Sequence, residues 1–263
     1  EYYIELTDNY FPFASLPNNL NGALALEIPS KSVNEKAELI KLKANNRTKD
    51  VIKRIMEITP SDGDLNVAIK TIKYGNFSSS VREDFGNLDN EKQKQNMEKS
   101  IAGSYKNNLR LEKISFNDLD KLNDSVTYSY SYKVTNEIAE IGSLNTFKII
   151  YPDIVASLDN FSSETRDYPI EYWSYENADA YETTVNIIAP AGKKFVELPK
   201  DEILSFKGLK YSIQYTLKTP GKLIVTRKFS DGREQQISPE DYPAFKAFFE
   251  KIVKAEQKFI AYK

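Results

Sequence analysis

The amino-acid sequence predicts an α+β fold dominated by β-strands, with antiparallel sheets in a sandwich-like arrangement and one surface helix in each half. Most segments alternate apolar and polar side chains with the period of a β-strand, whereas two segments carry apolar residues at helical spacing. The chain has 263 residues, of which 40% are hydrophobic and 28% charged, and this composition is typical of globular proteins. We therefore expect one large domain or two small ones.

The N-terminal segment predicts strands separated by long turns. Residues 1–8 alternate in the pattern of a half-buried strand, and the Pro- and Asn-rich stretch up to residue 29 is typical of a turn-rich excursion. Residues 34–58 contain two groups of apolar residues broken by Asn45-Asn46. This segment predicts either two short strands or a strand and a helical turn.

A hairpin followed by a helix is predicted next. Residues 62–85 alternate up to a Tyr74-Gly75-Asn76 turn, and the polar residues after it are interpreted as a return strand that ends at Val81-Arg82. Residues 90–109 place Met97, Ile101 and Tyr105 at helical spacing among charges. We expect a surface helix there.

The middle and the end of the chain predict more strands, one further hairpin and a second helix. The five strand segments are 125–138, 143–152, 166–178, 180–190 and 193–199. The hairpin spans 209–229 about Pro220-Gly221, and the helix spans 238–259 with Ser238 as its N-cap and Pro239 in its first turn. A hairpin followed by a helix is thus predicted twice along the chain. This repetition suggests either two related halves or convergence on a common motif.

The composition excludes several classes of function within this chain. It contains no cysteine and no histidine, so thiol nucleophiles, imidazole bases and the usual transition-metal ligands are absent. Asp62, Asp64 and Asp84 lack the glycine and glutamate of a calcium loop, so we expect no metal and no cofactor. A net charge of −2 gives no basic surface for nucleic acid, and no apolar run is long enough to span a membrane.

Two sets of residues are candidates for a ligand-binding face. Tyr128, Tyr130 and Tyr132 lie on one side of one predicted strand, where tyrosines could stack on sugars or bases but more often form an aromatic ladder in a sheet. The other set is the arginines near strand ends, which could clamp a peptide carboxylate or form structural ion pairs: Arg82, Arg166 and Arg227.

Both ends of the chain carry motifs that resemble one bacterial family. At the start these are Tyr2–Asp8, Pro12-Phe13-Ala14, Leu16-Pro17 and Asn21-Gly22-Ala23; towards the end they are Arg166–Ile170, Ala189–Gly192, Glu197–Pro199 and Ile237–Tyr242. The start is similar to the segment that closes the catalytic core of bacterial multidomain transglutaminase-like proteins. The end resembles the C-terminal domain of unknown function in that group.

The resemblance implies a domain organisation and a cellular location. Residues 1–30 would be the tail of a transglutaminase-like core, 31–165 a middle β-rich domain with one helix, and 166–263 a C-terminal β-rich domain that ends in an amphipathic helix. In the family, an aspartate of the last core strand orients the catalytic histidine, and Glu5 holds that place here. The resemblance further implies an upstream core in the same polypeptide and a periplasmic or secreted location.

Three hypotheses about function follow. The first is a non-catalytic accessory region of an exported transglutaminase- or peptidase-like protein, which supports the core or binds peptide or glycan. The second is an independent adhesion or assembly module, which would expose edge strands and an apolar patch. The third is a hydrolase that uses carboxylates, which needs two of them within about 5–10 Å in a cleft.

Overall fold

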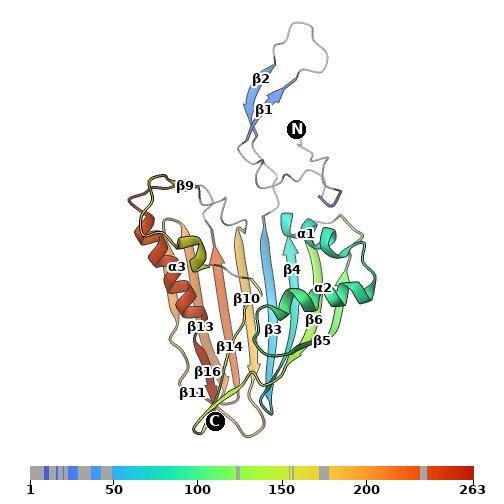
Figure 1. Ribbon diagram of the computed structural model, residues 1–263, viewed down its shortest axis with the longest axis vertical. Coiled ribbons are helices and arrows are strands. Elements are labelled where there is room, and N and C mark those ends of the chain that lie inside the picture. Colours follow the sequence, from blue (N-terminus) through green and yellow to red (C-terminus); the bar gives the residue numbers. More distant parts are fainter. Residues whose placement is uncertain are drawn as a thin grey trace.

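A computed structural model shows the β-dominated α+β fold that the sequence predicts (Figure 1). The structure describes residues 9–11, 16, 20, 23–28, 37–42, 49–122, 125–153, 155, 157–171, 178–231 and 236–263. The predicted first strand, with Glu5, lies outside these residues.

An eight-stranded sheet forms the body of the molecule (Figure 1), with the strand order β12-β13-β14-β10-β3-β4-β6-β5. The two central strands, β10 and β3, pair in parallel, and all other neighbours pair antiparallel. The predicted antiparallel pairing thus holds for all neighbours but one, and the single parallel pair makes the sheet mixed. The bounds are β3 Val51–Ser61, β4 Asp64–Tyr74, β5 Leu109–Asn117, β6 Ser125–Val134, β10 Ala180–Ile188, β12 Glu202–Phe206, β13 Leu209–Thr219 and β14 Lys222–Ser230.

Three smaller sheets complete the strands. A four-stranded sheet has the order β11-β16-β8-β7, and two pairs, β15 with β9 and β1 with β2, stand apart from it. The bounds are β1 Leu24–Glu27, β2 Glu38–Lys41, β7 Ala139–Ile141, β8 Leu144–Lys148, β9 Ile170–Glu171, β11 Phe195–Val196, β15 Gln236–Ile237 and β16 Phe259–Tyr262. Phe147 of β8 and Ile260 of β16 belong to the same hydrophobic core as the large sheet.

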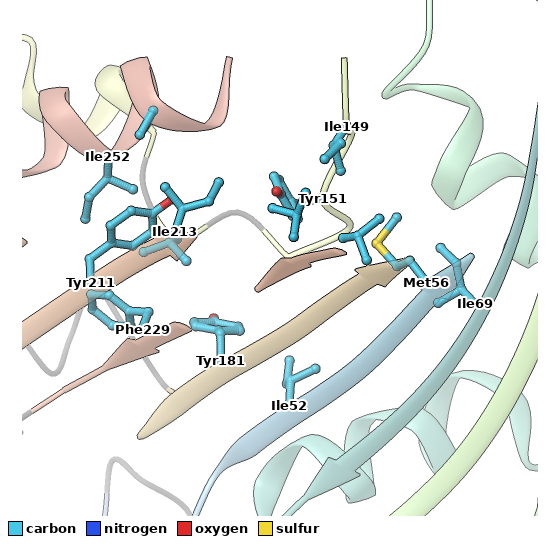
Figure 2. Close-up of a cluster of buried hydrophobic side chains, with 14 of the residues drawn as sticks. Ile52, Met56, Ile69, Ile149, Tyr151, Tyr181, Tyr211, Ile213, Phe229 and Ile252 are labelled. Atoms are coloured by element: carbon cyan, nitrogen blue, oxygen red, sulfur yellow. The ribbon is translucent and has the colours of Figure 1, made fainter. Parts of the chain in front are cut away.

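The eight-stranded sheet has one covered face and one open face. Along β3, β6 and β10, buried residues alternate with exposed or half-buried ones, because successive side chains of a strand point to opposite faces. On the covered face, side chains of the sheet meet Ile252 of α3 and residues of the segment 149–151 (Figure 2). The core thus runs continuously beneath both halves of the sheet. The sheet takes strands from both sides of residue 165. The division of the chain into three domains stays a prediction.

Among the described residues, three α-helices pack on the sheet: α1 Asn76–Phe85, α2 Asn90–Ala102 and α3 Tyr242–Glu256. α1 contacts β4 and β6, α2 contacts β5, and α3 contacts β12 (Figure 1). The side chain of Asp89 caps α2 by accepting a hydrogen bond from the Lys92 amide at 2.9 Å. The helix predicted over 90–109 is thus confirmed up to Ala102.

The return strand predicted before Val81-Arg82 is wrong, because residues 76–85 form helix α1. The carboxylate of Asp50 accepts hydrogen bonds from the backbone amide of Asn76 at 2.6 Å and from its side chain at 2.8 Å, which satisfies a donor at the helix start. The true hairpin partner of β4 is β3, across a turn in which both Asp62 and Gly63 have positive φ. Asp-Gly is a favoured pair for such a two-residue hairpin turn.

Other predicted elements are confirmed with changes at their ends. The hairpin about Pro220-Gly221 is formed by β13 and β14. The C-terminal helix begins at Tyr242 rather than Ser238, because Pro239–Asp241 form a turn in which Ser238 Oγ donates to Asp241. Of the segment 166–178, β9 is the strand that lies within the described residues.

Candidate functional site

The three predicted tyrosines of β6 form the centre of a buried row of aromatic rings. Tyr128, Tyr130 and Tyr132 are 6%, 5% and 2% exposed, and consecutive rings stack with centroids 6.1 Å apart. Phe116 stacks on Tyr128 at one end, and the hydroxyl of Tyr105 lies 2.8 Å from that of Tyr132 at the other. The ring faces thus lie against other rings on the covered face, where an external ligand cannot stack on them.

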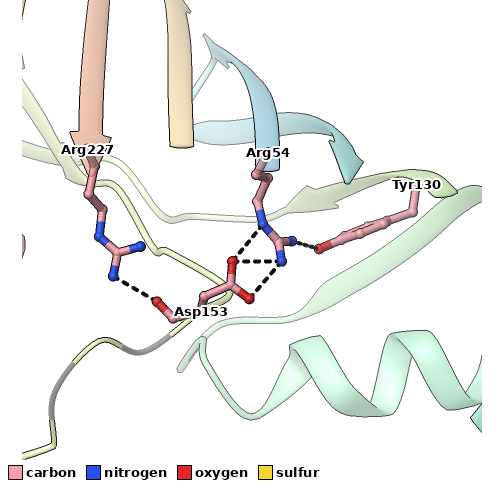
Figure 3. A network of polar contacts seen from close by, with 4 residues as sticks. All are labelled: Arg54, Tyr130, Asp153 and Arg227. Carbon is pink, nitrogen blue, oxygen red and sulfur yellow. Dashed lines mark hydrogen bonds and ion pairs between the residues drawn. The ribbon is translucent and has the colours of Figure 1, made fainter. Parts of the chain in front are cut away.

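A buried ion pair lies next to this row (Figure 3). Arg54 of β3 donates from Nε and Nη2 to the two carboxylate oxygens of Asp153 at 3.0 and 2.9 Å, and from Nη1 to the Tyr130 hydroxyl at 3.2 Å. Burial alone would lower the pKa of Arg54, but the charge of Asp153 and the neighbouring tyrosines raise it overall. Arg54 is therefore a permanent buried cation whose charge Asp153 neutralises.

Arg227 of β14 also contacts the loop that contains Asp153, from the opposite side of β10 to Arg54. Its Nη2 donates to the backbone carbonyl of Asp153 at 2.9 Å (Figure 3). Its Nε donates to Glu256 of α3. Its guanidinium lies over the ring of Tyr151, 4.5 Å from the centroid. Although burial lowers the pKa of Arg227, Glu256 raises it overall. Asp153 thus connects the two halves of the sheet through two arginines.

The other predicted arginines lie elsewhere. Arg82 of α1 is fully buried and donates to Ser78 Oγ at 3.0 Å and to the Ser125 carbonyl at 3.3 Å. The guanidinium of Arg166 lies over the ring of Tyr242, 5.2 Å from its centroid. The structure therefore brings Arg227 and Tyr130 into one network but leaves Arg82 and Arg166 outside it. The binding roles of all these residues stay predictions.

Sequence reasoning missed two residues at the centre of this network, Arg54 and Asp153. A signal for Arg54 exists, because it has the same strand parity as Ile52, Met56 and Ile58 and must point to the covered face with them. Asp153 lies in an irregular segment, so no periodic pattern marks it.

A pocket of about 280 Å³ opens beside the ion pair, and we name it the tyrosine pocket. Its buried floor is formed by Arg54, Tyr128, Tyr130 and Tyr132. Its rim contains exposed or half-buried polar residues: Lys73, Asp84, Ser100 and Ser104. Desolvation raises the pKa of Tyr105, Tyr130 and Tyr132 well above the ordinary value, so these hydroxyls stay protonated and can donate hydrogen bonds.

A larger groove of about 1110 Å³ lies on the other side of the sheet, and we name it the open-face groove. The side chains of its open-face positions come from four neighbouring strands, β3, β4, β6 and β5. The first residues of α2 also line it. Apolar, hydroxyl and charged groups alternate there, with Ile55, Glu57, Ala68, Lys70, Lys113, Ser129 and Ser131 among them.

The residues that the structure describes offer neither a metal centre nor a membrane-spanning helix. They contain no cluster of three metal-ligating side chains. None of the helices in the same part of the chain is long and apolar enough to cross a membrane.

Part of the chain matches a known family model. Residues 147–261 match the family described as "Domain of Unknown Function with solved-structure structure (DUF3858)". The matched region runs from β8 to β16 and includes β10, β12, β13, β14 and α3. The motifs predicted to resemble a C-terminal domain of unknown function, Arg166–Ile170 among them, lie inside it.

Comparison with solved structures gives a distant similarity. A crystal structure of "a putative protease from Parabacteroides distasonis ATCC 8503" is 16% identical and aligns with a TM-score of 0.34. The alignment covers 44% of this chain and spans 23% of that protein. A search among curated proteins finds no match.

Proposed function

We propose that this chain is a non-catalytic accessory region of an exported transglutaminase- or peptidase-like protein, and that its open-face groove binds an extended peptide. The observation that carries the proposal is the asymmetry of the eight-stranded sheet. One face is covered by helices and the smaller sheet, while the other presents a large groove across four strands. A sheet face of this kind is a binding surface held on a rigid scaffold.

The chemistry of the buried acids supports a non-catalytic role. The buried carboxylates of Asp153 and Glu256 each pair with an arginine, and together they tie a loop and α3 to the sheet. A carboxylate fixed in an ion pair with an arginine is held in a structural position, whereas general acid–base catalysis requires a group that can reach the substrate and exchange protons with it.

The residues of the open-face groove favour a peptide over a glycan. An extended glycan on an open sheet surface would need exposed aromatic faces for apolar contact, because such a surface lacks the enclosing walls of a pocket. The two aromatic residues at the groove, Phe116 and Tyr130, have their rings in the buried row of the covered face. An apolar strip at Ile55 and Ala68 between Lys70, Lys113 and Glu57 instead suits a peptide with alternating apolar and charged side chains.

A pair of matched substitutions tests this proposal. Ser131 of β6 and Ser212 of β13 are both half-buried serines at open-face positions, but Ser131 alone of the two lines the groove. Arrays of random decapeptides would first identify a binder for the full chain. We expect Ser131→Trp to weaken its affinity at least tenfold and Ser212→Trp to change it less than twofold.

Two outcomes would overturn the proposal. One is that no decapeptide binds, or that both tryptophan variants bind equally. The other is that the chain hydrolyses or transamidates peptides or glycosides by itself, which would instead support the carboxylate-dependent hydrolase.

One observation favours a second candidate, an adhesion or assembly module. The β1–β2 pair extends away from the large sheet (Figure 1), and Leu24, Leu26 and Leu39 are 73%, 57% and 71% exposed. Leu26 lies opposite Leu39, so these apolar side chains share one face. Sedimentation velocity of the chain and of a Leu26→Lys/Leu39→Lys variant tests this role, which requires association that the double variant abolishes.

A further inference from the structure

The tyrosine pocket lies on the covered side of the sheet, opposite the open-face groove, and has the form of a separate small-molecule site. Its floor is buried, whereas Asp84, Ser100 and Ser104 at its rim are exposed. Its volume of about 280 Å³ lies just below the range of about 300–1,000 Å³ typical of ligand pockets. It therefore fits one small molecule rather than a chain of residues.

Several hydroxyl groups at the floor have hydrogen-bonding capacity to spare. The oxygen of Tyr130 accepts from Arg54, which leaves its own hydrogen available to donate. Tyr105 and Tyr132 share one hydrogen bond, so one of their two hydroxyl hydrogens is also available. The Tyr128 hydroxyl makes no hydrogen bond to any residue that the structure describes, and Tyr128 lines the pocket although the residue is only 6% exposed. A ligand with several hydrogen-bonding groups would satisfy these atoms.

The charges at the pocket cancel. Arg54 pairs with Asp153 at 2.8 Å within the floor, and Lys73 and Asp84 at the rim contribute one charge of each sign. A charged ligand would therefore be buried without a net counter-charge, which costs free energy. An uncharged polar ligand avoids this cost.

The pocket also has apolar walls, and the stacked tyrosines of its floor offer no ring face. Met97, Ile101, Ile150 and Pro152 line it beside the polar groups. The rings of Tyr128, Tyr130 and Tyr132 stack on one another and on Phe116, so they present hydroxyl-bearing edges rather than faces to a ligand. Recognition then depends on hydrogen bonds at the floor and on apolar contact at the walls, a combination that suits a polyol ring.

We propose that the tyrosine pocket binds an uncharged, polyhydroxylated ligand of monosaccharide size. This site differs from the peptide groove of the proposed function, because Arg54 and Asp153 line only the pocket and Ser131 lines only the groove, although Tyr130 and α2 contribute to both. Binding of such a ligand would hold α1, α2 and the Asp153 loop together, since all three contribute residues to the pocket.

Saturation-transfer NMR on the full chain tests the proposal with four probes. Glucose and N-acetylglucosamine are the neutral probes, and glucosamine and glucuronate are their cationic and anionic relatives. We expect saturable binding of at least one neutral probe in the millimolar range, and at least fivefold weaker binding of both charged probes.

Three variants connect the binding to the pocket. Tyr128→Phe removes one hydroxyl but keeps the stacked ring, so we expect at least fivefold weaker binding, while Tyr168→Phe at an 81% exposed tyrosine leaves binding unchanged. Ser104→Trp at the exposed rim should abolish binding without disturbing the core, and circular dichroism checks that each variant is folded.

Three results would overturn the proposal: no saturable binding of either neutral probe, equal binding of the charged probes, or full binding by both Tyr128→Phe and Ser104→Trp. Ser131→Trp in the open-face groove separates the two proposals, because it should weaken peptide binding at least tenfold and leave binding of the neutral probe intact.

Discussion

The two faces of the eight-stranded sheet use the same alternating strands for different purposes. The covered face carries aliphatic and aromatic side chains and two buried arginines, whereas the open face carries serine, threonine, lysine and glutamate around the groove. Neighbouring residues of one strand therefore belong to different environments. The comparison teaches that stability and binding can be changed independently, one face at a time.

The largest expected effect comes from breaking the buried ion pair on the covered face. Arg54→Met leaves the Asp153 carboxylate without its partner, and removing one member of a buried pair costs about 3–5 kcal/mol. The adjacent Lys53 points to the open face, where its side chain is 49% exposed and lies 4.0 Å from Glu182. Lys53→Met should cost less than about 0.5 kcal/mol. Urea denaturation compares the two, and equal losses would contradict the division between the faces.

A smaller difference is expected for apolar neighbours of the same strand. Met56 is fully buried and Ile55 is 50% exposed, although they are adjacent in β3. Met56→Ala creates a cavity and should lower the free energy of unfolding by about 2–5 kcal/mol. Ile55→Ala should lower it by less than about 1 kcal/mol but should weaken peptide binding. Thermal unfolding together with the peptide titration measures both effects.

Removing a single hydroxyl should have a still smaller effect. Tyr130→Phe keeps the stacked ring and deprives Arg54 Nη1 of its acceptor, so unfolding should become easier by about 1–3 kcal/mol. The same change at Tyr168, on the surface, should have no measurable effect on the denaturation midpoint. If the two variants unfold alike, the Arg54–Tyr130 bond contributes nothing to stability.

On the alkaline side, a pH dependence of stability is expected from the buried tyrosines. Desolvation, together with the nearby charge of Glu256, raises the pKa of Tyr215 to about 12, and desolvation raises that of Tyr130 further. Because these folded-state values exceed the unfolded value of about 10, the tyrosines contribute stability that is complete below pH 10 and is lost as the pH rises through the folded values. Titration of tyrosinate absorbance should show an early class of exposed tyrosines and a later class that ionises together with unfolding. A single class near pH 10 would contradict the burial of the row.

Local patterns in the sequence were sufficient for much of the fold. The alternation in β6, β10, β13 and β14 predicts these strands, and the apolar stripe of α3 predicts its buried side. Parity also places the three tyrosines on one face, although it does not tell whether that face is covered. Shorter strands such as β12 and β16 have too few residues for a periodic signal.

Features that depend on distant residues could not be predicted in this way. The sequence of α1 resembles a polar strand. The start of the helix is stabilised by Asp50, which lies 26 residues earlier, so no local pattern reveals it. The parallel pairing of β3 with β10 is accompanied by a bond from the Asp50 amide to Asp179 across 129 residues, and no local pattern encodes it. The link from Asp153 to Arg54 spans 99 residues, so the centre of the polar network became visible in the structure alone.

The most direct test of the two-face account is to map a bound peptide on the full chain by backbone amide NMR. The account predicts shifts that cluster on the groove strands, at positions such as Glu57, Lys70, Ser131 and Lys113, with little change at α3 or at β12 and β13. Shifts that cluster instead on α3, or spread evenly over both halves of the sheet, would contradict the assignment of binding to the open face.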